Sequence, residues 1–135
     1  MVHSAQFPFG FGPFWGDAMM QDATPVLRVS DYARAREFYE GKLGFQVMEE
    51  GGDPAQFGIF RREKAQLFIN AWDGPEAAFD GWRAYIHVED IAETKSFLDV
   101  AGVALKSGPA VQPYGMEEIE IADPDGNVIC FGADA

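Results

Sequence analysis

The feature that most constrains the fold of this chain is an internal repeat. The segment DYARAREF at 31–38 recurs as DIAETKSF at 90–97, an offset of 59 residues, and QLF at 66–68 corresponds to ICF at 129–131 at an offset of 63. A unit of about 50 residues is too small to bury a sheet by itself, so two units must combine. The repeat therefore predicts one structure built from two similar halves.

Each half predicts one strand, one helix and three further strands. In the first, a strand at 24–30 precedes a helix capped by Asp31 and ended by Gly44, with strands at 45–50, 56–62 and 65–71. In the second, a strand at 83–89 precedes a helix between Asp90 and Gly102, with strands near 103–108, 117–122 and 127–132. We predict an α+β fold of two βαβββ repeats, about 24–72 and 82–132, forming curved mixed sheets around a concave pocket with the helices outside.

Alternation along the first strand of each repeat assigns its faces. The residues expected under the helices are Pro25, Leu27, Val29, Ala84, Ile86 and Val88. The residues expected to face the concave pocket are Thr24, Val26, Arg28, Arg83, Tyr85 and His87.

Charge and composition exclude several classes of partner. The net charge is −12, and the residues after position 72 carry 13 of the 22 acids but only 3 of the 10 bases. Nucleic acid is not expected as a partner, because binding its phosphates needs clustered Lys and Arg. No run approaches the roughly 20 apolar residues of a membrane span. With one cysteine and no secretion signal, we expect a cytoplasmic protein without disulfides or membrane contact.

Residues 1–22 differ in composition from the rest of the chain. Five aromatic residues alternate there with glycines and prolines, which prevent regular structure. We interpret 1–22 as an aromatic arm that either packs on the domain or a second subunit, or is a disordered leader. Residues 23–135 are interpreted as a single domain.

Four motifs together resemble the vicinal oxygen chelate superfamily, which includes glyoxalase I, extradiol dioxygenases, fosfomycin resistance enzymes and bleomycin resistance proteins. They are VLRVSDYARAREFYEGKLGF at 26–45, AQLFINA at 65–71, YIHVEDI at 85–91 and QPYGMEEIEIADPDGNVICF at 112–131. The enzymes of this superfamily usually hold a divalent metal with His or Glu from both repeats. The resemblance places Thr24, Leu67, Arg83 and Cys130 at those positions. Leu cannot coordinate a metal and Arg repels one, so we expect no metal, no cofactor and no catalytic residue.

Within the superfamily the chain is most similar to the bleomycin resistance proteins. The resemblance implies a homodimer with ligand grooves at its interface, in which Pro25 permits the first strand to exchange between subunits, and it places Phe57 and Tyr114 as groove aromatics. Trp72 and Tyr85 can also stack on a ligand, and His87 faces the pocket. Glu118 and Glu120 alternate with isoleucines and would then hold a cation in the same pocket. The DPDGN segment at 123–127 is predicted to be a hairpin turn rather than a calcium loop.

Three functions remain open at this point. The first is sequestration of a cationic aromatic small molecule such as bleomycin by a metal-free dimer, which would confer antibiotic resistance. The second is a glyoxalase- or dioxygenase-type enzyme with non-standard metal ligands. The third is binding of an unknown metabolite. For the site residues themselves, core packing and a solvated strand face are the structural alternatives.

Overall fold

The computed structural model describes residues 19–74, 79 and 81–135. The predicted aromatic arm therefore lies outside the described residues except for positions 19–22. The first module contains β1 (Val26–Val29), α2 (Tyr32–Arg36), the π-helix η2 (Glu37–Lys42), β2 (Gln46–Gly52), β3 (Ala55–Arg62) and β4 (Ala65–Ala71). The second contains β5 (Trp82–His87), α3 (Ile91–Ala101), β6 (Ser107–Val111), β7 (Met116–Ala122) and β8 (Val128–Asp134).

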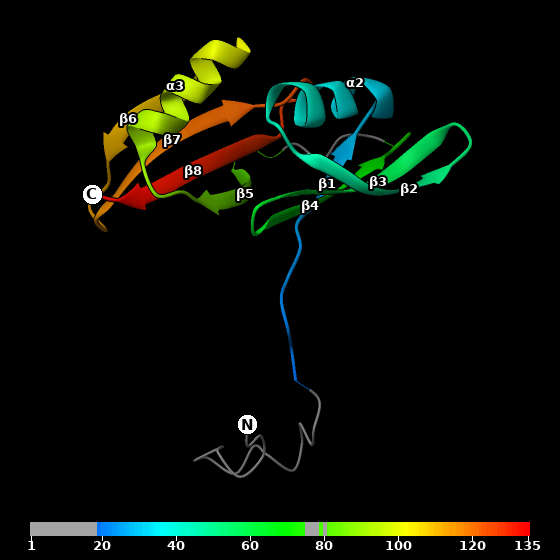
Figure 1. Ribbon diagram of the computed structural model, residues 1–135, viewed down its shortest axis with the longest axis horizontal. Coiled ribbons are helices and arrows are strands. Elements are labelled where there is room, and N and C mark those ends of the chain that lie inside the picture. The colour runs from blue at the N-terminus through cyan, green and yellow to red at the C-terminus, as the bar shows by residue number, and fades with distance from the viewer. Residues whose placement is uncertain (1–18, 75–78, 80) are drawn as a thin grey trace.

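The two modules have the same sheet topology, which confirms the predicted pair of βαβββ repeats. The strand orders are β1-β4-β3-β2 and β5-β8-β7-β6. In each sheet the first strand runs parallel to the last strand of its module and the other pairs are antiparallel, so both sheets are mixed. Figure 1 shows α2 and α3 on the same side of the two sheets. Each sheet is thus covered by a helix on one face. No helix of the described residues is long and apolar enough to cross a membrane.

The helices begin where the sequence predicts. Asp31 and Asp90 have extended backbones, and their side chains accept hydrogen bonds from the backbone N–H three residues later, as N-caps do. Gly102 ends α3 with a positive φ of 76°. The π-helix at 37–42 was not predicted: there Leu43 N–H donates to the carbonyl of Phe38, five residues back.

The core lies between the helices and the sheets. Leu27 and Val29 are 1% and 2% exposed, while Val26, which points to the helix-free side, is 57% exposed. The helix residues Phe38 and Tyr39 are buried against this face. The predicted alternation in β1 is therefore observed, and the side of each sheet away from the helices remains open.

Two irregularities correct the predicted second repeat. The strand predicted near 103–108 begins only at Ser107, because Val103 is buried in the core as part of the loop after α3. In β5 the pairing with β8 slips between Trp82 and Ala84, so that strict alternation fails at Arg83. As a result Trp82 joins the face of Tyr85.

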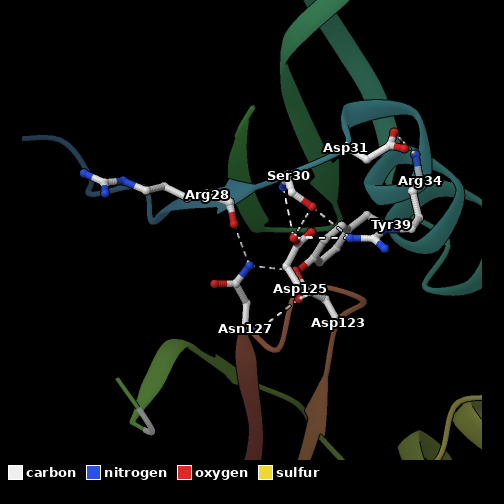
Figure 2. Close-up of polar contacts among 8 residues, drawn as sticks. All are labelled: Arg28, Ser30, Asp31, Arg34, Tyr39, Asp123, Asp125 and Asn127. Atoms are coloured by element: carbon white, nitrogen blue, oxygen red, sulfur yellow. Dashed lines mark hydrogen bonds and ion pairs between the residues drawn. The ribbon is translucent and has the colours of Figure 1, made fainter. Parts of the chain in front are cut away.

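The modules are joined by a buried polar cluster around the β7–β8 turn (Figure 2). The carboxylate of Asp123 is 5% exposed and accepts hydrogen bonds from the hydroxyl of Tyr39, the backbone N–H groups of Asp125 and Asn127, and the amide of Asn127. Asn127 also donates to the backbone carbonyl of Arg28 in β1. The DPDGN segment is thus a hairpin turn, as predicted, and it docks one module on the other.

Asp125 adds a second contact between the same modules. Its carboxylate accepts hydrogen bonds from the backbone and the hydroxyl of Ser30, at 3.0 and 2.7 Å, and it lies 3.3 Å from the guanidinium of Arg34. The turn of the second module therefore sits on the connection between β1 and α2.

Replacing Asn127 with alanine should destabilise the protein by about 1–3 kcal/mol, because it removes hydrogen bonds to the buried carboxylate of Asp123 and to the backbone carbonyl of Arg28. The free energy of unfolding, measured by urea denaturation, checks this. Asn70→Ala, on the open side of β4, is the matched control and should change stability by no more than about 0.5 kcal/mol. Equal losses in the two variants would contradict the assigned role of Asn127.

Candidate functional site

The open face of the second sheet carries most of the residues predicted for a ligand site. We use this name for the helix-free side formed by Trp82, Tyr85 and His87 on β5, Cys130 on β8, Glu118 and Glu120 on β7, Ser107 on β6 and Tyr114 in the loop before β7. Ile119 and Ile121, which alternate with the two glutamates, are fully buried on the helix side. The predicted orientation of the glutamates is therefore observed.

Three aromatic rings form a row along β5. The ring centroids of Trp82 and Tyr85 are 5.0 Å apart, and those of Tyr85 and His87 are 4.9 Å apart. The Tyr85 ring lies over Gly132 of the neighbouring strand, where a Cβ atom would collide with its hydroxyl. Gly132 thus lets the ring cross β8 toward β7.

Glu118 is held by two phenols. Its carboxylate accepts a hydrogen bond from the hydroxyl of Tyr85 at 2.8 Å and another from the hydroxyl of Tyr114 at 2.8 Å. Glu118 is 6% exposed, whereas Tyr114 is 60% exposed. An exposed ring therefore covers a buried carboxylate.

Glu120 is also held by uncharged donors. The indole N–H of Trp82 donates to it at 2.6 Å, and the hydroxyl of Ser107 donates at 2.9 Å. None of the ion pairs among the described residues involves Glu118 or Glu120. The two carboxylates are thus fixed by neutral partners, and none of the ion pairs found in the described part of the chain neutralises them.

Desolvation, assisted by the two carboxylates, keeps the neighbouring phenols and thiol protonated. Desolvation, and then the hydrogen bond to Glu118, raise the pKa of Tyr114 to about 12 and that of Tyr85 well above its usual value. Burial raises the pKa of the Cys130 thiol to about 12, with the charges of Glu118 and Glu120 adding to the effect. At neutral pH the two phenols are hydrogen-bond donors, and the thiol is not a nucleophile.

Phe57 and Trp72, two of the predicted site residues, lie on the first sheet instead. The ring of Phe57 packs edge-on against Phe68 with centroids 5.4 Å apart. Trp72 is 43% exposed and stacks under the guanidinium of Arg28 at 4.2 Å. These residues belong to a separate, more apolar open face.

A cleft of about 490 Å³ lies at the seam between the sheets, and Arg28, Trp72 and Arg83 are among its lining residues. A larger cleft of about 730 Å³ includes His87. Glu118 and Glu120 line neither cleft. The sequence predicted a concave pocket around these glutamates, but in the single chain they lie on an open surface.

The positions that resemble metal ligands do not fit a metal ion. Thr24 accepts a hydrogen bond from Gln66, its neighbour on β4, at 3.0 Å. Leu67 points into the core and is 1% exposed, so its predicted place in the pocket is wrong. Cys130 does face the open side, but the described residues contain no group of three or more His, Cys, Asp or Glu that could hold a metal.

The sequence reasoning missed Trp82 and Ser107, the donors to Glu120. Trp82 was missed because the bulge in β5 shifts the alternation by one residue. Ser107 was missed because β6 begins later than predicted. The position of Trp82 immediately before a predicted strand was a signal that could have identified it. Nothing in the sequence pointed to Ser107.

The fold and the site agree with a family assignment from sequence comparison. A profile of the glyoxalase/bleomycin resistance protein/dioxygenase superfamily matches residues 22–131. The chain belongs to this superfamily. A search of curated proteins gives no significant match.

Solved structures with the same fold include both binding proteins and an enzyme. A bleomycin-binding protein solved with bleomycin is 24% identical, with 86% of this chain and 100% of that chain covered and a TM-score of 0.71. TnmS3, an antibiotic binding protein from Streptomyces sp. CB03234, is 24% identical, with 87% and 99% covered and a TM-score of 0.66. Lactoylglutathione lyase from Agrobacterium tumefaciens is 19% identical, with 87% and 96% covered and a TM-score of 0.66. At these identities the likeness shows the fold alone.

Replacing Glu118 with glutamine should lower the pKa of Tyr114 from about 12 toward 10, because the negative hydrogen-bond acceptor is lost. In the wild-type protein, the stability that Tyr114 contributes through its raised pKa is present below pH 10 and is lost as the pH rises through 12. Ultraviolet titration of tyrosinate, with Tyr114→Phe used to identify the signal, measures the pKa, and urea denaturation at a series of pH values measures the stability. An unchanged pKa in Glu118→Gln would contradict the described geometry.

Proposed function

We propose that the protein sequesters a cationic, aromatic small molecule without a metal and without chemical conversion. The observation that carries this proposal is the pair of carboxylates, Glu118 and Glu120, held by neutral donors beside a row of aromatic rings. The rings offer faces for stacking, and the carboxylates offer uncompensated negative charge. A flat ligand with a cationic group uses both.

The energies favour a cation at this surface. A unit charge about 4 Å from one carboxylate gains about 4 kcal/mol at an effective dielectric constant near 20, before desolvation reduces it. A cation over an aromatic ring adds about 0.5–1 kcal/mol at an exposed site. Because the glutamates are already fixed by hydrogen bonds, little side-chain entropy is lost on binding.

The protonation states support binding rather than catalysis. The tyrosines and the cysteine of the open face have raised pKa values and stay neutral at physiological pH. The carboxylates accept hydrogen bonds from neighbours that fix them in place. We propose no catalytic residue, and the enzymatic alternative has no nucleophile on this surface to support it.

A second copy of the chain is proposed to complete the groove. Val26 on the first sheet and Tyr114 beside the second are 57% and 60% exposed on the helix-free side. Exposed apolar surface of this kind is commonly covered by association. A homodimer in which Phe57 and Trp72 of the first sheet approach the open face of the second would bring all the predicted site residues together. A cytoplasmic role in resistance to a drug of the bleomycin type belongs to this proposal, supported by the superfamily and by neighbours described as antibiotic-binding proteins.

Titration of metal-stripped protein with metal-free and copper-loaded bleomycin, followed by tryptophan fluorescence, tests the proposed function. We expect saturable binding at two sites per dimer. Glu120→Gln should weaken it by about tenfold, since one charge contact is lost. Tyr114→Ala should also weaken it because the ring is removed.

Glu117→Gln is the matched control, since Glu117 is on the same strand but alternates to the opposite side. It should leave the affinity unchanged within about twofold, because its charge is screened from the groove. No binding of either form of bleomycin at micromolar protein would remove the drug from the proposal. Equal weakening by both Glu→Gln variants would show that general charge, and not the open face, governs binding.

A further inference from the structure

The two modules meet at two junctions that the internal repeat makes equivalent. At the first, the β7–β8 turn docks on the connection between β1 and α2 through the hydrogen bonds of Asp123, Asp125 and Asn127 (Figure 2). At the second, the β3–β4 turn at 63–64 faces the connection between β5 and α3. There no hydrogen bond between the turn and that connection is found among the described residues. The second junction is therefore the more open of the two.

The second junction contains the larger cleft of the described residues, with a volume of about 730 Å³. Its apolar lining includes Phe45, Ile86, Val88, Phe97 and Phe131. Binding sites for small molecules typically have about 300–1,000 Å³ and mostly apolar walls. The cleft is thus large enough for such a molecule and has a suitable interior.

One wall of this cleft is fixed by Arg62. Its guanidinium donates to the backbone carbonyl of Leu43 at 2.8 Å, lies over the ring of Phe97 at 4.4 Å and pairs with Glu63 at 3.2 Å. The positive charge of Arg62 is therefore already used within the fold. This wall is therefore held in place by contacts within the protein.

The opposite rim is acidic. Glu89, Asp90 and Glu93 line the cleft, and none of them takes part in an ion pair among the described residues. The start of α3 contributes about half a positive charge, which three carboxylates exceed. With Lys64, Arg62 and Glu63 included, the formal charge of the lining residues is −2. The rim therefore favours a positive ligand group.

We propose that this cleft is a second binding site, for a small molecule with a flexible apolar body and one cationic group. The apolar part would lie among Ile86, Phe97 and Phe131, and the cationic group would lie beside Glu89 and Glu93. The site differs from the open face in its ligand, because the aromatic residues here form walls of a cavity rather than an exposed row for stacking. It does not depend on the proposed function.

Decyltrimethylammonium and decyl sulfate, two probes with the same chain and opposite charge, test the proposal. Titrations of the full chain below their micelle concentrations, followed by amide NMR, locate and measure binding. We expect the cation to bind at least about tenfold more tightly than the anion and to shift Ile86, Val88 and Phe97. Equal affinity for the two probes, or shifts confined to the open face, would overturn the proposal.

Ala65→Trp, which adds a large side chain to the lining, should weaken binding of the cation by at least about tenfold. Ala92→Trp, on the exposed side of α3 and outside the lining, is the control and should have no effect. Glu93→Gln should weaken binding of the cationic probe and leave binding of the anionic probe unchanged. This variant keeps the test valid if Ala65→Trp fails to fold. If none of these changes alters binding, the cleft is not the site.

Tyr114→Phe separates this inference from the proposed function. It should leave binding of decyltrimethylammonium unchanged, since Tyr114 does not line the cleft. A second copy of the chain is the competing occupant of the cleft. In that case the apparent affinity for the probe would fall as the protein concentration rises, and the proposal would be wrong.

Discussion

The arrangement of the molecule depends on the buried carboxylate of Asp123. An ionised group at 5% exposure is tolerated only when hydrogen bonds replace its water, and Asp123 receives four. These donors come from its own turn and from Tyr39 of the first module. Because β7 and β8 extend from this turn, the same interaction sets where Glu118, Glu120 and Cys130 stand relative to the first sheet. The open face is therefore positioned from one end of the β7–β8 hairpin.

A second constraint is that each sheet is covered by a helix on one side only. The side with helices supplies the core, and its buried strand residues, such as Leu27, Ile69 and Ile119, come from strands other than the outer β2 and β6. The other side exposes apolar and aromatic residues such as Val26, Trp72 and Tyr114. A sheet that is half uncovered in this way provides recognition surface at the expense of stability. The core of the chain thus lies on one face of the sheets, and the proposed ligand site lies on the other.

The parts of the structure that sequence predicts well are those governed by local rules. The caps at Asp31 and Asp90 and the alternation of Glu118 and Glu120 with isoleucines depend on neighbours only a few residues away. The sequence match of Leu67 to Cys130, at an offset of 63, is wrong by one residue. Val26 pairs with Phe68 in the first module, and Tyr85, its equivalent at an offset of 59, pairs with Cys130 in the second. The counterpart of Cys130 is therefore Phe68, and Leu67 points to the other side of the sheet. The register between strands that are distant in sequence depends on tertiary packing, which local patterns do not encode.

The donors to Glu118 and Glu120 favour the proposed cation site over an ordinary acidic surface. A glutamate that serves solubility is exposed, yet Glu118 is 6% exposed. A buried glutamate that serves stability is commonly paired with Arg or Lys, which cancels its charge. Here phenol, indole and hydroxyl groups fix the carboxylates and leave their charge in place. A cation bound beside them, as proposed above, would supply the charged partner that they lack among the described residues.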